Sequence, residues 1–194
     1  MTVDDFPYLR ERRSRRDFLR VTGMTAAGGS VLVLATCGDD DEEAVEAGQR
    51  DVRLLNAALD LENVAIAVYT AGAALLEGEA LRLGRQFLQH EKEHAARLSQ
   101  LIEDLGGTPH EPRSDEEYEQ GFPKLRQQTD VLRFASDVEN AAVAKYVEAI
   151  PKLSSAELRQ TSAAIVSNEA EHRSVLLGLL GEPQVPNAFV TGTE

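Results

Sequence analysis

Residues 62–69 read ENVAIAVY and residues 139–146 read ENAAVAKY, so one eight-residue pattern occurs twice at a spacing of 77 residues. In both copies a glutamate opens a run of small and apolar residues, and a tyrosine closes it. A second pattern, Glu-x-x-His, follows each copy and occurs in this sequence only at residues 91–94 and 169–172. The chain therefore contains an internal repeat of 77 to 78 residues, and this repeat decides how the fold is interpreted.

Around both copies the apolar residues recur at alternating steps of three and four, which is the spacing of a helix that packs in a bundle. We expect helices at about residues 51–78, 79–105, 124–150 and 154–180, the last of which should open with a capping box of Ser154 and Glu157. The composition agrees, because aromatic residues make up only 5% of the chain and Trp is absent. Sheets favour aromatic and β-branched residues, whereas this composition favours helix.

The connections between these segments predict the topology. The first and second helices meet across a short turn, as do the third and fourth, so each pair should be antiparallel. Between the pairs lies the polar segment 106–123, which can extend up to roughly 60 Å and so can travel the length of a bundle. The sequence predicts an all-α, antiparallel four-helix bundle with one long crossover between helices 2 and 3.

Six polar residues occupy inward positions near the middle of these helices: Glu62, Glu91, His94, Glu139, Glu169 and His172. An isolated buried carboxylate costs several kcal/mol, so four of them need a neutralising partner. Two divalent cations would balance four carboxylates and two neutral imidazoles. A carboxylate-rich set with one histidine per ion suits iron, or else manganese, better than zinc. The sequence therefore predicts a site for two metal ions.

Simpler interpretations exist for each residue taken alone. A single inward glutamate can be the partner of a salt bridge, and a lone histidine can be an ordinary core residue with its hydrogen bonds satisfied. His90 lies one turn before His94 and could approach the site, but we expect it to face solvent. Glu93 and Glu171 point away from the inward positions and should be surface residues.

The six inward residues resemble the ligand motif of the ferritin-like superfamily of di-iron carboxylate bundles, in which two helices each supply a Glu and two supply Glu-x-x-His. The resemblance covers about residues 51–180. It implies that Glu62 and Glu139 are terminal ligands and that Glu91 and Glu169 bridge the metals. It also implies that His94 and His172 each bind one metal.

The same resemblance gives a role to the two tyrosines that close the repeated pattern. It implies that Tyr69 and Tyr146 donate hydrogen bonds to the ligands or donate electrons to the centre. The alternative is that each is an ordinary core tyrosine with a bonded hydroxyl.

The N-terminal region has the features of an export signal. Residues 14–20, SRRDFLR, resemble the twin-arginine signal, and the following apolar run is too short and too polar for a transmembrane anchor. Residues 34–37, LATC, resemble a bacterial lipobox with Cys37 as the lipid-bearing residue. The alternative is a chance cysteine in a signal that is cleaved elsewhere.

These features predict the domain organisation and the location. We expect a signal at 1–37, an acidic flexible tether at 38–50, the bundle at 51–180 and an irregular tail at 181–194. A twin-arginine signal before such a bundle resembles the exported ferritin-like domain proteins of bacteria. The export machinery is then a partner, and the protein is periplasmic or lies on the outer face of the cell membrane, where a lipid on Cys37 would attach it as a lipoprotein.

Composition excludes several functions and cofactors. The 33 acidic residues against 20 Lys and Arg give a net charge of -13, which argues against nucleic acid as a partner. Cys37 is the only cysteine, so we expect no iron–sulfur cluster. Met1 and Met24 both lie in the signal region, so we expect no haem ligated by methionine.

A carboxylate-bridged iron pair reacts with oxygen or peroxide, so the first hypothesis is a di-iron oxidoreductase. It would oxidise ferrous iron as a ferroxidase, or reduce peroxide as a peroxidase. The alternatives are metal binding or storage without turnover, a stress-related surface protein, and peroxide dismutation as in manganese catalases. A homo-oligomer is compatible with any of these functions.

Overall fold

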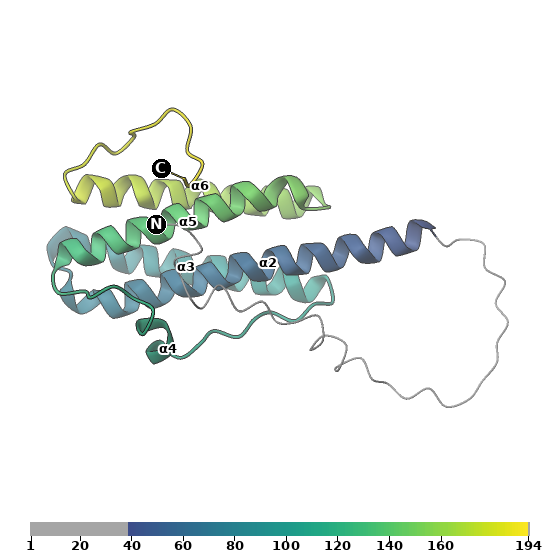
Figure 1. Cartoon of the computed structure of the whole chain (residues 1–194), viewed down its shortest axis with the longest axis horizontal. Coiled ribbons are helices and arrows are strands. Elements are labelled where there is room, and N and C mark those ends of the chain that lie inside the picture. Colours follow the sequence, from purple (N-terminus) through teal and green to yellow (C-terminus); the bar gives the residue numbers. More distant parts are fainter. Residues whose placement is uncertain (1–38, 194) are drawn as a thin grey trace.

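We analysed a computed structural model of the chain, in which residues 39–193 are described. Four long helices form the bundle (Figure 1): α2 (Asp39–Gly72), α3 (Gly78–Asp104), α5 (Gln128–Ala149) and α6 (Ala156–Leu179). Residues 39–193 contain no β-strand. The all-α class and the helical bundle predicted from the sequence are confirmed.

Short connections join the helices in antiparallel pairs. The single 3-10 turn η3 (Ala73–Leu75) leads from α2 towards α3, and η4 (Ile150–Lys152) leads from α5 towards α6. At the start of α3, Gly78 has a φ of 52°, a left-handed conformation that glycine adopts without steric cost. The two helical pairs then pack against each other mainly through α2 and α5.

The segment between α3 and α5 is held at two points, by Asn56 in the middle of α2 and by Glu77 at the start of α3. At its start, the Asn56 side chain donates to the Thr108 carbonyl over 3.1 Å and accepts from the His110 amide over 2.7 Å. At its end, the Gln128 side chain accepts from the Glu77 amide over 2.9 Å. At the rise per residue of a helix, Asn56 and Glu77 are separated along the chain by roughly 30 Å. Figure 1 shows the segment running back along the bundle.

This segment also contains a short helix that the sequence analysis did not predict. The helix α4 (Asp115–Glu119) starts at a capping box, in which the Ser114 hydroxyl accepts from the Glu117 amide. The Glu117 carboxylate accepts in return from the Ser114 amide over 3.0 Å. Reciprocal bonds of this kind satisfy amide groups that the first helical turn leaves free.

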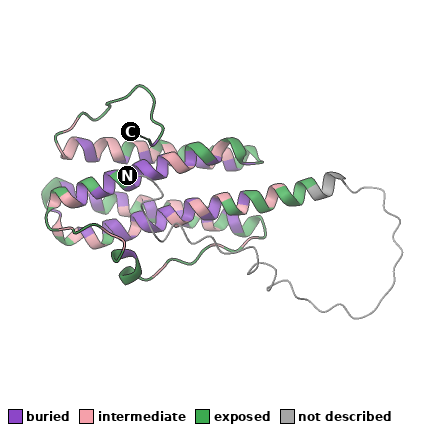
Figure 2. Cartoon of the chain, viewed as in Figure 1, coloured by how far each residue is buried: buried purple, intermediate pink, exposed green. Residues whose placement is uncertain are grey.

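The start of α2 differs from the prediction. Residues 38–50 were expected to form a flexible tether, but α2 begins at Asp39 and continues through this segment. Within the described part of this segment, Ala44 and Ala47 have high helix propensity. The extension also adds turns to a helix that is already packed, so it needs no new nucleus. Figure 2 shows that residues 43–50 of this extension are largely exposed.

A second difference concerns the start of α6. Ser154 and Glu157 were expected to form a capping box, but the N-cap is Ser155, whose hydroxyl accepts from the Leu158 amide over 3.2 Å. Ser154 instead donates through its amide, over 3.1 Å, and through its hydroxyl to the carboxylate of Asp51. Asp51 is fully buried, so this carboxylate requires donors and takes Ser154 out of the capping position.

The hydrophobic core consists of two clusters that leave a polar layer between them. On α2 one cluster contains Leu55 and Leu59 and the other contains Val64 and Val68, so that Glu62 lies at the boundary. The remaining long helices show the same division, as on α3, where Phe87 and Leu98 belong to different clusters. Each buried Leu or Val contributes about 1.5–3 kcal/mol, so two apolar clusters can carry one unfavourable polar layer.

Two features of the chain relate to its location. Within the described residues, one helical segment, Glu43–Leu75, is long and apolar enough to cross a membrane, with a mean hydropathy of 1.2. Because 61% of its apolar window is buried inside the bundle, it is the pattern of a core helix as well. The predicted twin-arginine signal and the lipobox at Cys37 lie outside the described residues.

Candidate metal centre

The polar layer brings together all six side chains that the sequence analysis selected. Each antiparallel pair supplies three of them: α2 and α3 contribute Glu62, Glu91 and His94, and α5 and α6 contribute Glu139, Glu169 and His172. The four glutamates and His172 are at most 1% exposed. The His94 side chain is 14% exposed, so this histidine lies closest to solvent.

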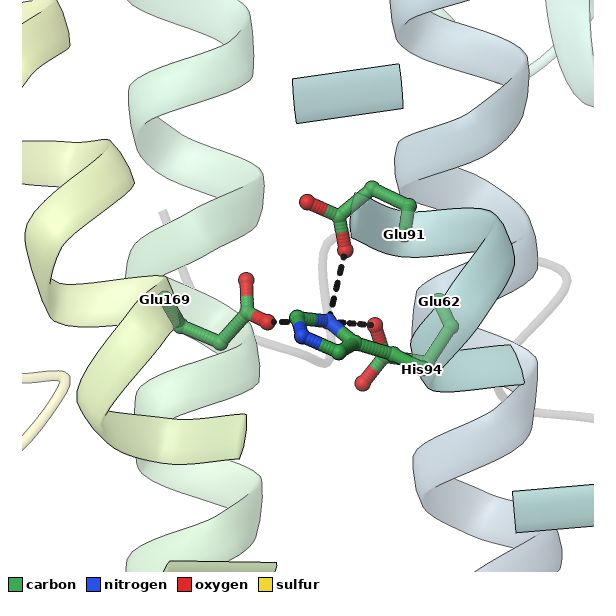
Figure 3. Close-up of side chains that lie close together, drawn as sticks. All are labelled: Glu62, Glu91, His94 and Glu169. Carbon is green, nitrogen blue, oxygen red and sulfur yellow. Dashed lines mark ion pairs between the residues drawn. The ribbon is translucent and has the colours of Figure 1, made fainter. Parts of the chain in front are cut away.

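The first donor group surrounds His94. Its Nδ1 lies 2.9 Å from Glu169 Oε1 and 3.4 Å from both Glu62 Oε2 and Glu91 Oε2. Figure 3 shows these three carboxylates converging on this one ring nitrogen, two from the α2–α3 pair and one from α6.

The second donor group surrounds His172. Its Nδ1 lies 2.9 Å from Glu91 Oε1, 3.5 Å from Glu139 Oε1 and 3.7 Å from Glu169 Oε2. Glu91 and Glu169 therefore belong to both groups and turn one oxygen towards each histidine. In each group the donor atoms all lie within 4.8 Å of one another.

Most of these donor atoms lack hydrogen bonds. Among the described residues, eight buried atoms of this layer make none: Glu62 Oε2, both oxygens of Glu91 and of Glu169, Glu139 Oε2, and the Nδ1 atoms of His94 and His172. Unsatisfied buried polar atoms are rare because each costs roughly 1–3 kcal/mol. Eight of them converging in two groups fit the donor set of two metal ions.

Charge repulsion shows in the pKa of the two glutamates that belong to only one donor group, Glu62 and Glu139. Burial raises the pKa of Glu62 and of Glu139 well above the ordinary value, and the neighbouring carboxylates raise it further. The cause is that a second negative charge nearby disfavours ionisation, and does so more strongly in a buried site. The side chains alone therefore cannot hold four ionised carboxylates.

The histidines respond in the opposite direction. Burial acts to lower the pKa of His94, but contacts with Glu169, Glu62 and Glu91 outweigh it and raise the pKa to about 12. The pKa of His172 also rises to about 12, for the same reasons. Burial acts to raise the pKa of Glu169, yet its close contacts with Glu139, His172 and His94 bring it below the ordinary value. Metal ions would therefore compete with protons at these groups.

The two tyrosines hydrogen-bond to carboxylates of the opposite half. The Tyr69 hydroxyl donates to Glu139 Oε1, and the Tyr146 hydroxyl donates to Glu62 Oε1 over 2.5 Å. Burial raises the pKa of both hydroxyls well above the ordinary value, so both keep their protons and remain donors. Both interpretations offered by the sequence include a bonded hydroxyl, and the structure shows that the acceptor of each hydroxyl is a glutamate of the polar layer. The crossing between halves was not predicted.

His90 is the residue whose position the sequence analysis predicted wrongly. It was expected to face solvent, but it is half-buried and its Nδ1 lies 2.9 Å from His172 Nε2. Its place one turn before His94 was the available signal. The position of His90 on α3 allows its side chain to turn towards solvent or towards α6. Only the neighbouring α6 determines that it turns towards His172. Glu93 and Glu171 are exposed, as predicted.

A class of helical bundle proteins with metal sites is defined by a buried centre to which two helices each supply a Glu and two helices each supply Glu-x-x-His. The sequence matches the ferritin-like domain family over residues 50–182, and the chain belongs to this family.

Solved structures show the same fold. The chain is 23% identical to a ferritin-like, diiron-carboxylate protein from Bacillus anthracis, with a TM-score of 0.59, covering 69% of this chain and 97% of the other. A dodecameric thioferritin from Bacteroides fragilis is 21% identical with a TM-score of 0.59, and coverage is 72% and 93%. A conserved hypothetical protein from Mycobacterium tuberculosis is 17% identical with a TM-score of 0.62, and coverage is 68% and 98%. A comparison with curated proteins gives no match.

Proposed function

We propose that this protein binds two iron ions in its polar layer and oxidises ferrous iron with oxygen or peroxide. The observation that carries the proposal is the set of eight buried donor atoms without hydrogen bonds, arranged in two groups that share Glu91 and Glu169. Glu62 and His94 would complete one position, and Glu139 and His172 the other. Two divalent ions would cancel the charge of the four carboxylates.

The chain's own residues would do three things in this reaction. The carboxylates would hold ferrous iron and, because they are anionic, would favour the ferric product over the ferrous substrate. The apolar clusters on both sides would keep water from the centre. Tyr146 would hold Glu62 in place by donating to Oε1, the oxygen that does not face His94. Tyr69 would hold Glu139 in the same way, by donating to Oε1, the oxygen that also lies near His172.

The electron balance is simple. Two ferrous ions each lose one electron, and one molecule of oxygen accepts two electrons and two protons and leaves as hydrogen peroxide. With peroxide as the oxidant, the same two electrons and two protons break the O–O bond and give two molecules of water. In both cases the ferric ions are the other product, so the reaction needs no further electron donor.

We further propose that the protein works outside the cytoplasm. The support is the sequence SRRDFLR at residues 14–20, followed by LATC at 34–37. Export of a full-length chain fused to a reporter, with Arg15 and Arg16 both changed to Lys as the control, tests this location. Loss of export in the paired variant supports the proposal, and unchanged export contradicts it.

The activity is tested by stopped-flow mixing of metal-free protein with ferrous iron in oxygenated buffer, following ferric absorbance. We expect a fast phase at up to two ferrous ions per chain, lost in Glu91→Ala and retained in the matched surface variant Glu93→Ala. Glu93 is exposed and bonds Gln89 on its own helix over 3.0 Å. Oxidation no faster than in protein-free buffer, with two ions still bound, would leave metal binding without turnover as the function.

A further inference from the structure

The two metal positions differ in what supports their histidines. The repeat aligns His90 with Asn168, each one residue before the Glu-x-x-His pattern. His90 Nδ1 lies 2.9 Å from His172 Nε2, across the boundary between α3 and α6. Asn168 makes no equivalent contact in the described structure, because its side-chain amide donates to Glu171 on its own helix over 3.4 Å. One histidine of the centre is therefore held by a third histidine, and the other is not.

The direction of the hydrogen bond follows from the donor geometry. His172 turns its Nδ1 towards the carboxylates, the nearest being Glu91 Oε1 at 2.9 Å. A neutral imidazole that offers the lone pair of Nδ1 to a metal carries its proton on Nε2. Nε2–H must then donate to His90 Nδ1, which fixes both the tautomer and the orientation of the His172 ring.

Packing restrains the same ring further. Phe87 stacks on His172 with ring centroids 4.1 Å apart and an interplanar angle of 27°. The His172 side chain is 1% exposed, whereas the His94 side chain is 14% exposed. His172 is thus preorganised at its edge by His90 and at its face by Phe87, and His94 keeps more freedom.

We propose that His90 is a positioning residue that makes the metal position at His172 the tighter of the two, so that the position at His94 fills second and exchanges more readily. This inference rests on the proposed two-metal site. A hydrogen-bond partner of a metal-binding histidine commonly contributes about 10-fold to 100-fold in metal affinity. Among the described contacts, the polar partners of His94 are all carboxylates of its own donor group, and Asn168, the counterpart of His90, bonds within its own helix.

The test is a titration of the metal-free full chain with cobalt(II), following visible absorbance and heat. We expect two resolved steps in the wild-type protein. In His90→Ala the tighter step should weaken by about 10-fold to 100-fold, while two ions still bind at saturation. In His90→Asn the affinity should stay close to wild type, because the amide oxygen can take the place of Nδ1 as acceptor. Asn168→Ala is the matched control and should leave both steps unchanged.

A double-mutant comparison assigns the effect to one position. Adding His90→Ala to His94→Ala should still weaken binding, whereas adding it to His172→Ala should change nothing further. If His90→Ala does not fold, as judged by circular dichroism, His90→Gln is the second variant, since its longer side chain moves the acceptor away from the position of Nδ1.

Three results would overturn the inference. Wild-type affinities in His90→Ala would show that the contact is idle. A loss in His90→Asn as large as that in His90→Ala would show that the ring packs but does not act as an acceptor. An equal loss in the His172→Ala background would show that His90 acts elsewhere. A wild-type chain that binds no cobalt would refute the proposed metal site itself, which is a different outcome from any of these.

Discussion

The α2–α3 half and the α5–α6 half of the bundle carry the same residues in the same order, yet neither contains a complete donor group. The group around His94 takes Glu169 from the other half, and the group around His172 takes Glu91. The tyrosines cross in the same way, from Tyr69 to Glu139 and from its repeat counterpart to Glu62. The centre therefore forms only when the two halves pack against each other, because each donor group needs a repeated polar residue from both halves.

The halves differ where the repeat is broken. His90 in α3 has Asn168 as its counterpart in α6, and His94 is more exposed than His172. The first helices of the two halves also begin differently. The helix α2 extends back to Asp39, whereas α5 begins shortly after the short helix α4. The shared residues thus build two donor groups, and the unshared ones make the surroundings of the two groups unequal.

The largest expected effect comes from a ligand that both groups share. Glu91→Ala removes one oxygen from each donor group and should abolish binding at both positions, whereas Glu62→Ala should remove only the position at His94. Elemental analysis of loaded protein should then give no bound ion in Glu91→Ala and one per chain in Glu62→Ala. Glu93→Ala, on the exposed side of the same helix, should retain two. Equal loss in Glu91→Ala and Glu62→Ala would break the distinction between shared and unshared ligands.

Metal removal should have the next largest effect. A ligand that binds only the docked, folded state stabilises it by about 4 kcal/mol when its concentration is a thousandfold above Kd. Chelation should therefore lower the free energy of unfolding of the wild-type protein by that order, as measured by denaturant titration. Glu91→Ala should not respond to the chelator, and a response as large as that of wild type would show that the stabilising ion binds elsewhere.

The tyrosine pair tests whether the halves are equivalent outside the ligands. Tyr69→Phe and Tyr146→Phe each leave a buried glutamate oxygen without its donor, at a cost of about 1–3 kcal/mol in the free energy of unfolding. Denaturant titration of metal-loaded variants should give losses equal within about 0.5 kcal/mol. A loss of unfolding free energy in only one of the two variants would show that the tyrosines are not equivalent. The two halves would then differ at the tyrosines as well as at His90.

The smallest effect concerns an exposed contact between the halves. Arg97 on α3 pairs with Glu157 on α6 over 2.9 Å, but the side chains are 37% and 70% exposed. Arg97→Ala should lower the free energy of unfolding by less than about 1 kcal/mol, and by still less in high salt. A larger, salt-independent loss would mean that surface pairing, and not the buried centre, holds the halves together.

The sequence was most informative where one chemical requirement acts through a fixed spacing. The six donors could be predicted because polar residues at inward helical positions contradict an apolar core, and because the pattern occurs twice. The four helices followed from the same periodicity. No tertiary information was needed for either prediction.

The sequence was less informative where a neighbouring element decides between local alternatives. His90 could turn towards solvent or towards α6, and only the position of His172 decides. Ser154 lost its capping role to the buried carboxylate of Asp51, which lies 103 residues away in the chain. The acidic segment at the start of α2 has the charge of a tether, but it continues a helix whose later turns are packed. In each case a contact distant in sequence overrides a local preference.

The most direct test of the two-metal centre is anomalous X-ray diffraction at the iron absorption edge, on crystals of the full chain loaded with iron. We expect two peaks in each chain, one enclosed by Glu62, Glu91, His94 and Glu169 and the other by Glu91, Glu139, Glu169 and His172. Peaks that both lie between the shared glutamates and the two histidines would establish the centre. A single peak in a fully loaded chain, or none in this layer, would contradict it.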